Sequence, residues 1–325
     1  MTTFKEIRGT TIEVVSSDPS NPETGQIWYN SSSGTLKGYK FVGTWSSGGN
    51  VNTSRFALGA AGTQTATIAA SGYGPAVPGS NLTASESYNG IAWTNTNSVN
   101  TAVRYTDVFG TQTAAVKVGG YVGPAATTST ELWNGTSWTS NPTGNNTARY
   151  SGATAGIQTA GLFFGGTTVP ATTAATESWN GSVWTNVNSM NTARFDLGGV
   201  GLQTAALAFG GYAPSATGAT ESYNGTTWTT LPATMNTARA ELSGAGIQTS
   251  ALAFGGATPT VQTATESFNG TSWTSNPTGL ANARSNAAGS GTQTSALNTG
   301  GVNGTAVSAA TEEWTGVGIQ TITVS

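Results

Sequence analysis

Residues 222–228, SYNGTTW, decide the fold, because the same phrase recurs along most of the chain. It consists of an aromatic residue, Asn-Gly, two small residues and Trp. Four further copies are SYNGIAW, LWNGTSW, SWNGSVW and SFNGTSW, and a weaker one is FVGTW at residues 41–45. The tryptophans that end the six copies lie 48, 45, 46, 44 and 45 residues apart: Trp45, Trp93, Trp138, Trp184, Trp228 and Trp273. A period of about 40–50 residues is the length of one four-stranded propeller blade.

Turn signals divide each copy into four strands. A G-x-Q-T element leads into a strand of small and apolar residues that stops at Gly-Gly, as in GIQTSALAFGG at residues 246–256. A loop of about ten residues follows, and then a Thr-Glu strand that carries the aromatic residue. Asn-Gly favours a tight hairpin because both turn positions need positive φ, so this strand is expected to fold straight back into the Trp strand.

The connections between these strands predict two unlike faces. The G-x-Q and Asn-Gly links are short, whereas the loops after Gly-Gly and after Trp each span about ten residues. In an up-and-down blade the two long loops emerge on the same side. One face should therefore be loop-rich and the other trimmed. Because loops carry specificity more often than strands do, segments such as 120–129 and 139–147 are the predicted recognition surface.

The repeat resembles the kelch repeat. Residues 254–284, FGGATPTVQTATESFNGTSWTSNPTGLANAR, contain a Gly-Gly doublet, an aromatic residue, a Trp about five residues later and a polar link to Arg, in the kelch order. The resemblance covers about residues 45–314. It implies an all-β, kelch-like β-propeller, which we assign to residues 45–325. Residues 1–44 are expected to form a separate N-terminal segment that also supplies the closing strand.

Closure of the ring can be predicted from the two ends of the repeat region. The last copy reaches Trp314 but lacks an Asn-Gly…Trp strand, and the first copy begins with a spare strand at about residues 39–45. We therefore predict six blades, with Trp45 beside the Trp314 strand so that no sheet edge is exposed. The alternative is seven blades, with TIEVV, the IWYN hairpin and the C-terminal GIQTITVS as the extra sheet.

Charged residues make up only 8% of the chain, yet each copy keeps one Arg and one Glu. Such regular pairs predict buried structural ion pairs within or between blades, because a buried charge needs a partner. A ring of arginines that binds an anion is the alternative. The residues are Arg55, Arg104, Arg149, Arg194, Arg239 and Arg284, with Glu86, Glu131, Glu177, Glu221, Glu266 and Glu312.

Composition excludes several function classes. With neither Cys nor His, the chain has no thiolate or imidazole for a metal site or for nucleophilic catalysis, and its Asp residues show no glycosidase spacing. We expect no enzyme activity, cofactor or metal. The net charge of −3 argues against nucleic-acid binding, and no apolar run reaches the ~20 residues of a membrane span. A charged N-terminus, MTTFKEIRGTTIEVV, argues against a signal peptide.

Three tyrosines distinguish some blades from others. Tyr73, Tyr121 and Tyr212 follow the Gly doublet or its equivalent, where the other copies carry Thr, Ala or Val. Aromatic rings among Thr, Asn and Gly are candidate carbohydrate contacts, because sugar faces stack on rings. The alternative is that each Tyr caps its blade. The repeated Trp residues and the Gln of each G-x-Q-T are expected to be structural, packing between sheets and binding backbone groups.

The N-terminal segment resembles one found near the start of many virion structural proteins of tailed bacteriophages, on the residues GQIWYN: Gly25, Gln26, Ile27, Trp28, Tyr29 and Asn30. The resemblance implies a tail fibre, tail-associated or decoration protein in the virion, present in multiple copies and attached to the particle through residues 1–44. Its partners would be other virion proteins and host-surface polysaccharide. The alternative is a cellular kelch-like scaffold or carbohydrate-binding module. A galactose-oxidase relative is excluded, because that family's copper centre needs His and Cys.

Overall fold

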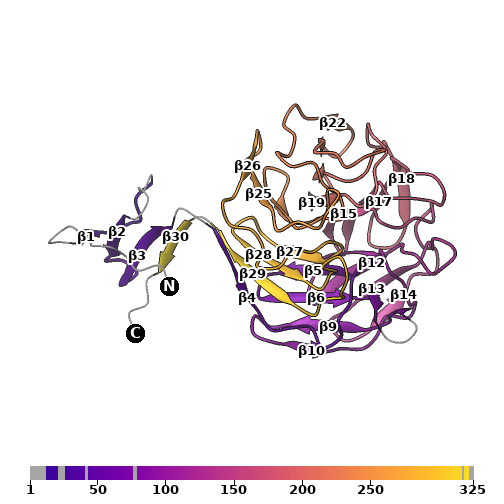
Figure 1. The fold of residues 1–325 in the computed structure, drawn as a ribbon, viewed down its shortest axis with the longest axis horizontal. Coiled ribbons are helices and arrows are strands. Elements are labelled where there is room, and N and C mark those ends of the chain that lie inside the picture. The colour runs from indigo at the N-terminus through magenta and orange to yellow at the C-terminus, as the bar shows by residue number, and fades with distance from the viewer. Residues whose placement is uncertain (1–11, 21–25, 41–42, 76–78, 317, 322–325) are drawn as a thin grey trace. The chain divides into compact units, whose positions relative to one another are not determined.

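The computed structural model describes residues 12–20, 26–40, 43–75, 79–316 and 318–321, and their regular elements are all β-strands (Figure 1). The chain divides into two compact units. One comprises Thr44–Thr315, and the other joins Met1–Gly43 with Gly316–Ser325. Each unit is described by itself.

Thr44–Thr315 is an all-β propeller in which the described residues form six four-stranded antiparallel sheets. We call these sheets blades 1 to 6, in chain order. The innermost strands are β5 Gly59–Thr63, β11 Asp107–Thr111, β15 Ala153–Ile157, β19 Gly198–Leu202, β23 Ser243–Ile247 and β27 Ala288–Gly291. The second strands are β6 Ala66–Ala70, β12 Ala114–Val118, β16 Ala160–Phe164, β20 Ala205–Phe209, β24 Ser250–Phe254 and β28 Ser295–Thr299.

The outer half of each blade holds the repeated aromatic residues. The third strands are β9 Ser85–Tyr88, β13 Thr130–Trp133, β17 Thr176–Trp179, β21 Thr220–Tyr223, β25 Thr265–Phe268 and β29 Thr311–Thr315. The outermost are β10 Trp93–Asn95, β14 Trp138–Ser140, β18 Trp184–Val187, β22 Trp228–Thr230, β26 Trp273–Ser275 and β4 Thr44–Ser47. In blade 1, β7 Tyr73–Gly74 and β8 Ser80–Asn81 form an additional two-stranded ladder.

The predicted sealing of the ring is confirmed. Strand β4 from the N-terminal side pairs antiparallel with β29 from the C-terminal side, and Trp45 lies opposite Trp314. The Trp45 indole N–H donates to the Thr265 hydroxyl of blade 5 at 2.9 Å. The outer edge of blade 6 therefore comes from the opposite end of the repeat region.

A continuous belt of backbone hydrogen bonds joins the inner strands at their N-terminal ends. One residue per blade donates its N–H to the carbonyl of the equivalent residue on the preceding blade, at 2.7–3.0 Å. All six residues have φ between 51° and 56°, although none is Gly, and such backbone costs about 1–3 kcal/mol per residue. The residues are Ala57, Tyr105, Ser151, Asp196, Glu241 and Asn286. We call them the belt residues.

Apolar packing and repeated side-chain bonds join neighbouring blades. Trp228 of blade 4, for example, packs with Phe164 of blade 3. Its indole N–H donates to the Thr176 hydroxyl of blade 3 at 3.0 Å, and every blade repeats this bond to the first residue of the preceding third strand. Gln203 donates to the Gly161 and Trp179 carbonyls of blade 3. As predicted, the repeated Trp and Gln residues are structural.

The Asn-Gly hairpins form where predicted, but their turns differ from the expected type. Tyr223 pairs with Trp228, so the loop has four residues rather than two. Gly225 has a φ of 90°, whereas Asn224 is not among the residues with positive φ. The Asn224 side-chain oxygen instead accepts the N–H groups of Thr226 and Thr227, at 2.9 and 2.8 Å. Asn stabilises the turn through its side chain, which is the Asx geometry.

The other unit contains one four-stranded sheet in the order β1 Glu13–Val15, β2 Ile27–Asn30, β3 Thr35–Lys40 and β30 Gly318–Thr321. Strand β1 runs parallel to β2, and β30 pairs antiparallel with β3. The strands of the seven-bladed alternative therefore form a sheet in this unit. Asp18 accepts hydrogen bonds from the Trp28 indole at 3.0 Å and the Asn30 amide at 2.7 Å. Trp28 and Asn30 of the GQIWYN motif therefore both hold the Asp18 carboxylate against strand β2.

Candidate binding face

Five of the six repeated arginines contact the glutamate of their own blade and lie fully buried. In blade 4 the Arg194–Glu221 distance is 3.0 Å, and Arg194 also donates to the carbonyls of Gly210 and Ala219. Glu221 accepts the backbone N–H groups of Asn191 and Thr192. Each pair thus fixes the link from one blade to the next. Because these guanidinium groups are buried and paired, they do not form an anion-binding ring.

Blade 2 departs from the expected pairing. Val103, and not Arg104, occupies the buried position of the other five arginines, since its carbonyl accepts the same backbone bond from a Gly on the preceding blade. Glu131 pairs instead with Lys117 of strand β12, at 2.9 Å. The assignment of Arg104 to an ion pair with Glu131 is therefore wrong. The motif NTAVR carries its Arg one residue later than NTAR does, and the amino-acid pattern alone did not show which residue is buried.

Arg104 lies on the loop-rich face between Tyr73 and Tyr121, two of the three tyrosines that were predicted to contact carbohydrate. Its guanidinium carbon is 4.8 Å from the centre of the Tyr73 ring and 4.6 Å from that of Tyr121. Tyr73 also contacts Phe56 edge-on at 5.5 Å, and Tyr121 contacts Tyr150 at 5.0 Å. These five half-buried side chains come from blades 1 to 3, and we call them the stacked platform: Phe56, Tyr73, Arg104, Tyr121 and Tyr150.

Asn81 connects the loops that carry the platform. Its amide oxygen accepts a hydrogen bond from Arg104 at 3.0 Å, and its amide nitrogen donates to the Tyr121 carbonyl at 2.9 Å. The loop of blade 1 is thus tied to that of blade 2. Such contacts restrict the Arg104 side chain.

Tyr212 stands apart from the other two tyrosines. It contacts Phe195 of the same blade at 5.4 Å, and the two residues form an isolated bridge. The equivalent bridges are Ala240 with Ala257 in blade 5 and Ser285 with Val302 in blade 6. Aromatic residues at these bridges therefore occur on blades 1 to 4, while blades 5 and 6 carry small or aliphatic ones. The loop-rich face is chemically asymmetric although the strands repeat.

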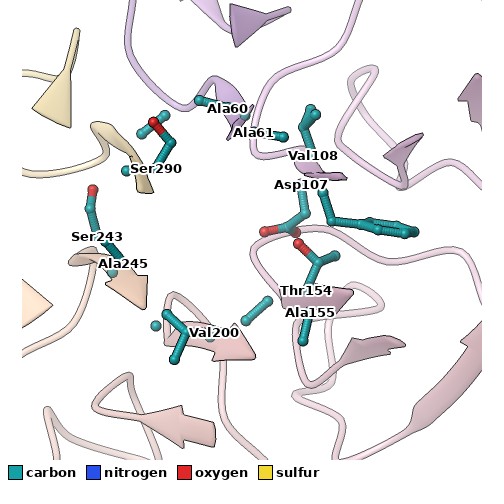
Figure 2. Close-up of a pocket in the computed structure, with 18 of the residues that line it drawn as sticks. Ala60, Ala61, Asp107, Val108, Thr154, Ala155, Val200, Ser243, Ala245 and Ser290 are labelled. Carbon is teal, nitrogen blue, oxygen red and sulfur yellow. The ribbon is translucent and has the colours of Figure 1, made fainter. Parts of the chain in front are cut away.

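Small residues line the channel along the propeller axis (Figure 2). Its cavity is about 250 Å³ and is lined by the inner strands, largely by Gly and Ala. Asp107 and Thr154 direct side-chain oxygens into it (Figure 2). Burial, with the negative charge of Asp196, raises the pKa of Asp107 to about 7. In the sequence, Asp107 and Asp196 are far apart, because they belong to different blades, and nothing there indicated that their carboxylates interact.

The belt residues line a smaller cavity of about 90 Å³ at the end of the channel where the inner strands begin, and two of them, Asp196 and Glu241, are acidic. Burial also raises the pKa of Asp196 to about 7, and Glu241 adds to the effect. The Glu241 carboxylate accepts a hydrogen bond from Asn286 at 2.8 Å. Within the described ranges, no group of three His, Cys, Asp or Glu residues has a metal-binding arrangement.

The trimmed face carries a different feature. Ile157, Leu202 and Ile247 end the inner strands of blades 3, 4 and 5, and they are 47%, 52% and 54% exposed. The equivalent residues of the other blades are Thr63, Thr111 and Thr292. Half of the inner rim on this face is therefore apolar.

No protein-family model matches the chain, and no curated protein matches its sequence. Among the residues that the structure describes, no helix has the length and apolar character needed to cross a membrane.

Proposed function

We propose that this chain is a non-enzymatic binding protein whose loop-rich face recognises glycans on a host surface. The observation that carries the proposal is the asymmetry of that face. The strands repeat from blade to blade and five of the six blades share the Arg–Glu pair, whereas the stacked platform occurs only on blades 1 to 3. Closing the propeller ring does not require a group of aromatic side chains that is present on only some of the blades. Tyr and Arg are enriched among the residues that contribute most of the binding energy at protein interfaces.

We further propose that the protein belongs to the virion of a tailed bacteriophage, as a tail fibre, tail-associated or decoration protein. This part rests on the GQIWYN resemblance of the N-terminal segment. Mass spectrometry of purified virions tests it directly. Peptides of this chain at several copies per particle are the expected result, and their absence from virions would favour a cellular kelch-like protein.

Glycan-array binding by the purified protein tests the recognition face. The variant Tyr73→Ala/Tyr121→Ala/Tyr212→Ala should lose about tenfold or more in affinity for the glycans that the parent protein binds, since it removes two rings of the stacked platform and the Tyr212 ring of blade 4 from the loop-rich face. A matched control is Ile157→Ser/Leu202→Ser/Ile247→Ser, which changes three exposed residues of the trimmed face. This control should bind like the parent, and both variants should be checked by thermal unfolding.

A second candidate function follows from the apolar rim on the trimmed face. Exposed Ile157, Leu202 and Ile247 fit a protein partner better than a sugar, because apolar side chains are typical of protein interfaces. Loss of a protein partner in the Ser variant, with no glycan bound by the parent protein, would favour an interaction scaffold.

A further inference from the structure

Arg104 differs from every other described cation of the propeller unit. Six of the seven basic side chains there form a buried ion pair with a glutamate. Arg104 forms none with a described carboxylate, and it lies half-buried on the loop-rich face. Although the chain has few charged residues, Arg104 therefore takes no part in the buried ion pairs that stabilise the blades.

The sequence of blade 2 explains how Arg104 is freed from the scaffold. Val103 occupies the position of the buried arginine, and Lys117 neutralises Glu131 from the neighbouring strand. Lys117 and Glu131 lie directly opposite each other on paired strands. Glu131 keeps its backbone contacts to Asn100 and Thr101, so the blade retains its link. The structural role is filled without Arg104.

The surroundings of Arg104 hold its guanidinium in place while leaving donors unused. The rings of Tyr73 and Tyr121 lie against it, that of Tyr105 lies at 6.0 Å, and Asn81 accepts one hydrogen bond from Nη1. A guanidinium has five N–H donors in a planar fork. The bond to Asn81 is the one that the Arg104 guanidinium makes to described residues. The remaining N–H groups suit a planar or tetrahedral anion, which an arginine can bind through two parallel hydrogen bonds.

We propose that the stacked platform binds an acidic saccharide, with Arg104 paired to a carboxylate, sulfate or phosphate group on the sugar. The proposal rests on the glycan-binding function above and deepens it by naming the charge of the ligand. Tyr73 and Tyr121 already use their rings in contacts with Arg104, Phe56 and Tyr150. Their part is to orient the guanidinium and to offer ring edges and hydroxyl groups. The sugar ring itself need not stack on them.

The net charge of the chain confines the attraction for an acidic saccharide to the surroundings of Arg104. With a net charge of −3, the protein has no general attraction for polyanions. Asp196 and Glu241 lie at the belt of blades 4 and 5, next to the channel, and they disfavour an anion there. An acidic glycan should therefore contact the platform on blades 1 to 3, and its affinity should fall as salt concentration rises.

Two pairs of polysaccharides with matched backbones test the proposal by biolayer interferometry. Polygalacturonate is compared with its fully methyl-esterified form, and dextran sulfate with dextran. The parent protein should prefer the charged member of at least one pair, and the pair that responds identifies a carboxylate or a sulfate-like group. Arg104→Gln should lower affinity for the charged polymer by about tenfold to a hundredfold, as expected for a lost charge-assisted bond. Arg104→Lys should retain part of it.

Lys37→Gln is the matched control, because it removes the same charge from the other unit, where Lys37 lies 3.9 Å from Asp18. It should bind like the parent protein. Thermal unfolding of each variant shows whether the platform loops remain folded, and Arg104→Lys keeps the test valid if Arg104→Gln does not fold.

The possible failures are distinguishable. Equal binding of charged and neutral polymers, or full binding by Arg104→Gln, would overturn the acidic-saccharide proposal and leave glycan recognition standing. No binding of any glycan by the parent protein would overturn both. Binding of an acidic peptide such as polyglutamate in place of all polysaccharides would also overturn it and would identify a protein ligand.

Discussion

Arg149 of blade 3 and Arg104 of blade 2 are the same residue type in nearly the same sequence motif, yet they meet opposite environments. Arg149 is fully buried, 2.7 Å from Glu177, and it also donates to the Phe163 carbonyl. Arg104 is half-buried between two tyrosines with Asn81 as its hydrogen-bond partner. A shift of one residue separates a structural charge from a surface one. In a repeat protein, the position that departs from the pattern is where function can be sought.

The first prediction compares the two kinds of arginine and has the largest expected effect. Arg194→Ala or Glu221→Ala should lower the free energy of unfolding by about 3–5 kcal/mol, because each leaves a buried charge without its partner. Arg104→Gln should lower it by only about 1–2 kcal/mol, since it removes half-buried cation–π contacts and one hydrogen bond but leaves no buried charge unpaired. Urea unfolding of the three variants measures the difference. Equal losses would mean that Arg104 is structural after all.

The second prediction restores the common arrangement in blade 2. Lys117→Ala alone should lower stability by about 3 kcal/mol, because Glu131 remains buried and unpaired. Val103→Arg together with Lys117→Ala places an Arg where the other five blades have one, and it should recover most of that loss. The measurement is again the urea midpoint. A double variant that melts as early as the single one would show that blade 2 cannot accept the repeated pair.

The third prediction concerns the repeated Trp that comes from the other end of the chain. Trp45→Ala should lower stability by about 2–3 kcal/mol, because the side chain packs on Phe254 and Trp314 and donates to Thr265. Hydrogen exchange should rise first in β29, whose outer neighbour is β4. Trp45→Phe keeps an aromatic ring and should lose about 1 kcal/mol, the contribution of the hydrogen bond. Unchanged exchange in β29 would argue against a closing role.

The fourth and smallest effect tests the channel carboxylates, which stand outside the repeated pairs. The pKa of Asp107 is about 7 in the folded protein, above its ordinary value of 3.8, so the folded state holds this proton more tightly than the unfolded chain does. The stability contributed by protonated Asp107 is thus fully present below about pH 4 and is lost as pH rises through about 7.

Asp107→Asn removes this dependence. We compare the free energy of unfolding of the variant with that of the parent protein at each pH. This difference should shift in favour of the variant by about 1–2 kcal/mol as the pH rises from 4 to 8, because a neutral amide avoids the cost of burying the charge. Thermal unfolding at both pH values gives the difference, and the pH 4 measurement serves as the internal control. A variant that loses stability at pH 8 would show that the ionised carboxylate is well solvated in the channel.

Much of the propeller could be predicted from spacing alone. The Trp period indicated the blade, Gly-Gly and Asn-Gly marked the strand ends, and the spare strand before Trp45 matched the one missing after Trp314. These predictions succeed because every repeat packs on a neighbour of the same sequence. A residue such as Gln203 therefore meets the same carbonyls as its equivalents in other blades.

The turn chemistry of Asn-Gly was predicted less well. The dipeptide correctly located the hairpins, but Asn224 acts through its side chain and only Gly225 takes positive φ. Loop length decides this, since the pairing of Tyr223 with Trp228 leaves four residues to close. The letters Asn-Gly do not specify the register of the strands around them.

The sequence by itself determined the repeat, the order of strands in each blade, the closing strand and the presence of one Arg and one Glu per copy. Only the tertiary structure decided that Val103 is buried in place of Arg104, that Lys117 pairs with Glu131, and that Tyr73, Arg104 and Tyr121 stack. The physical reason is that periodicity encodes contacts made identically in every repeat. A contact made once, between loops of different blades, leaves no period to detect.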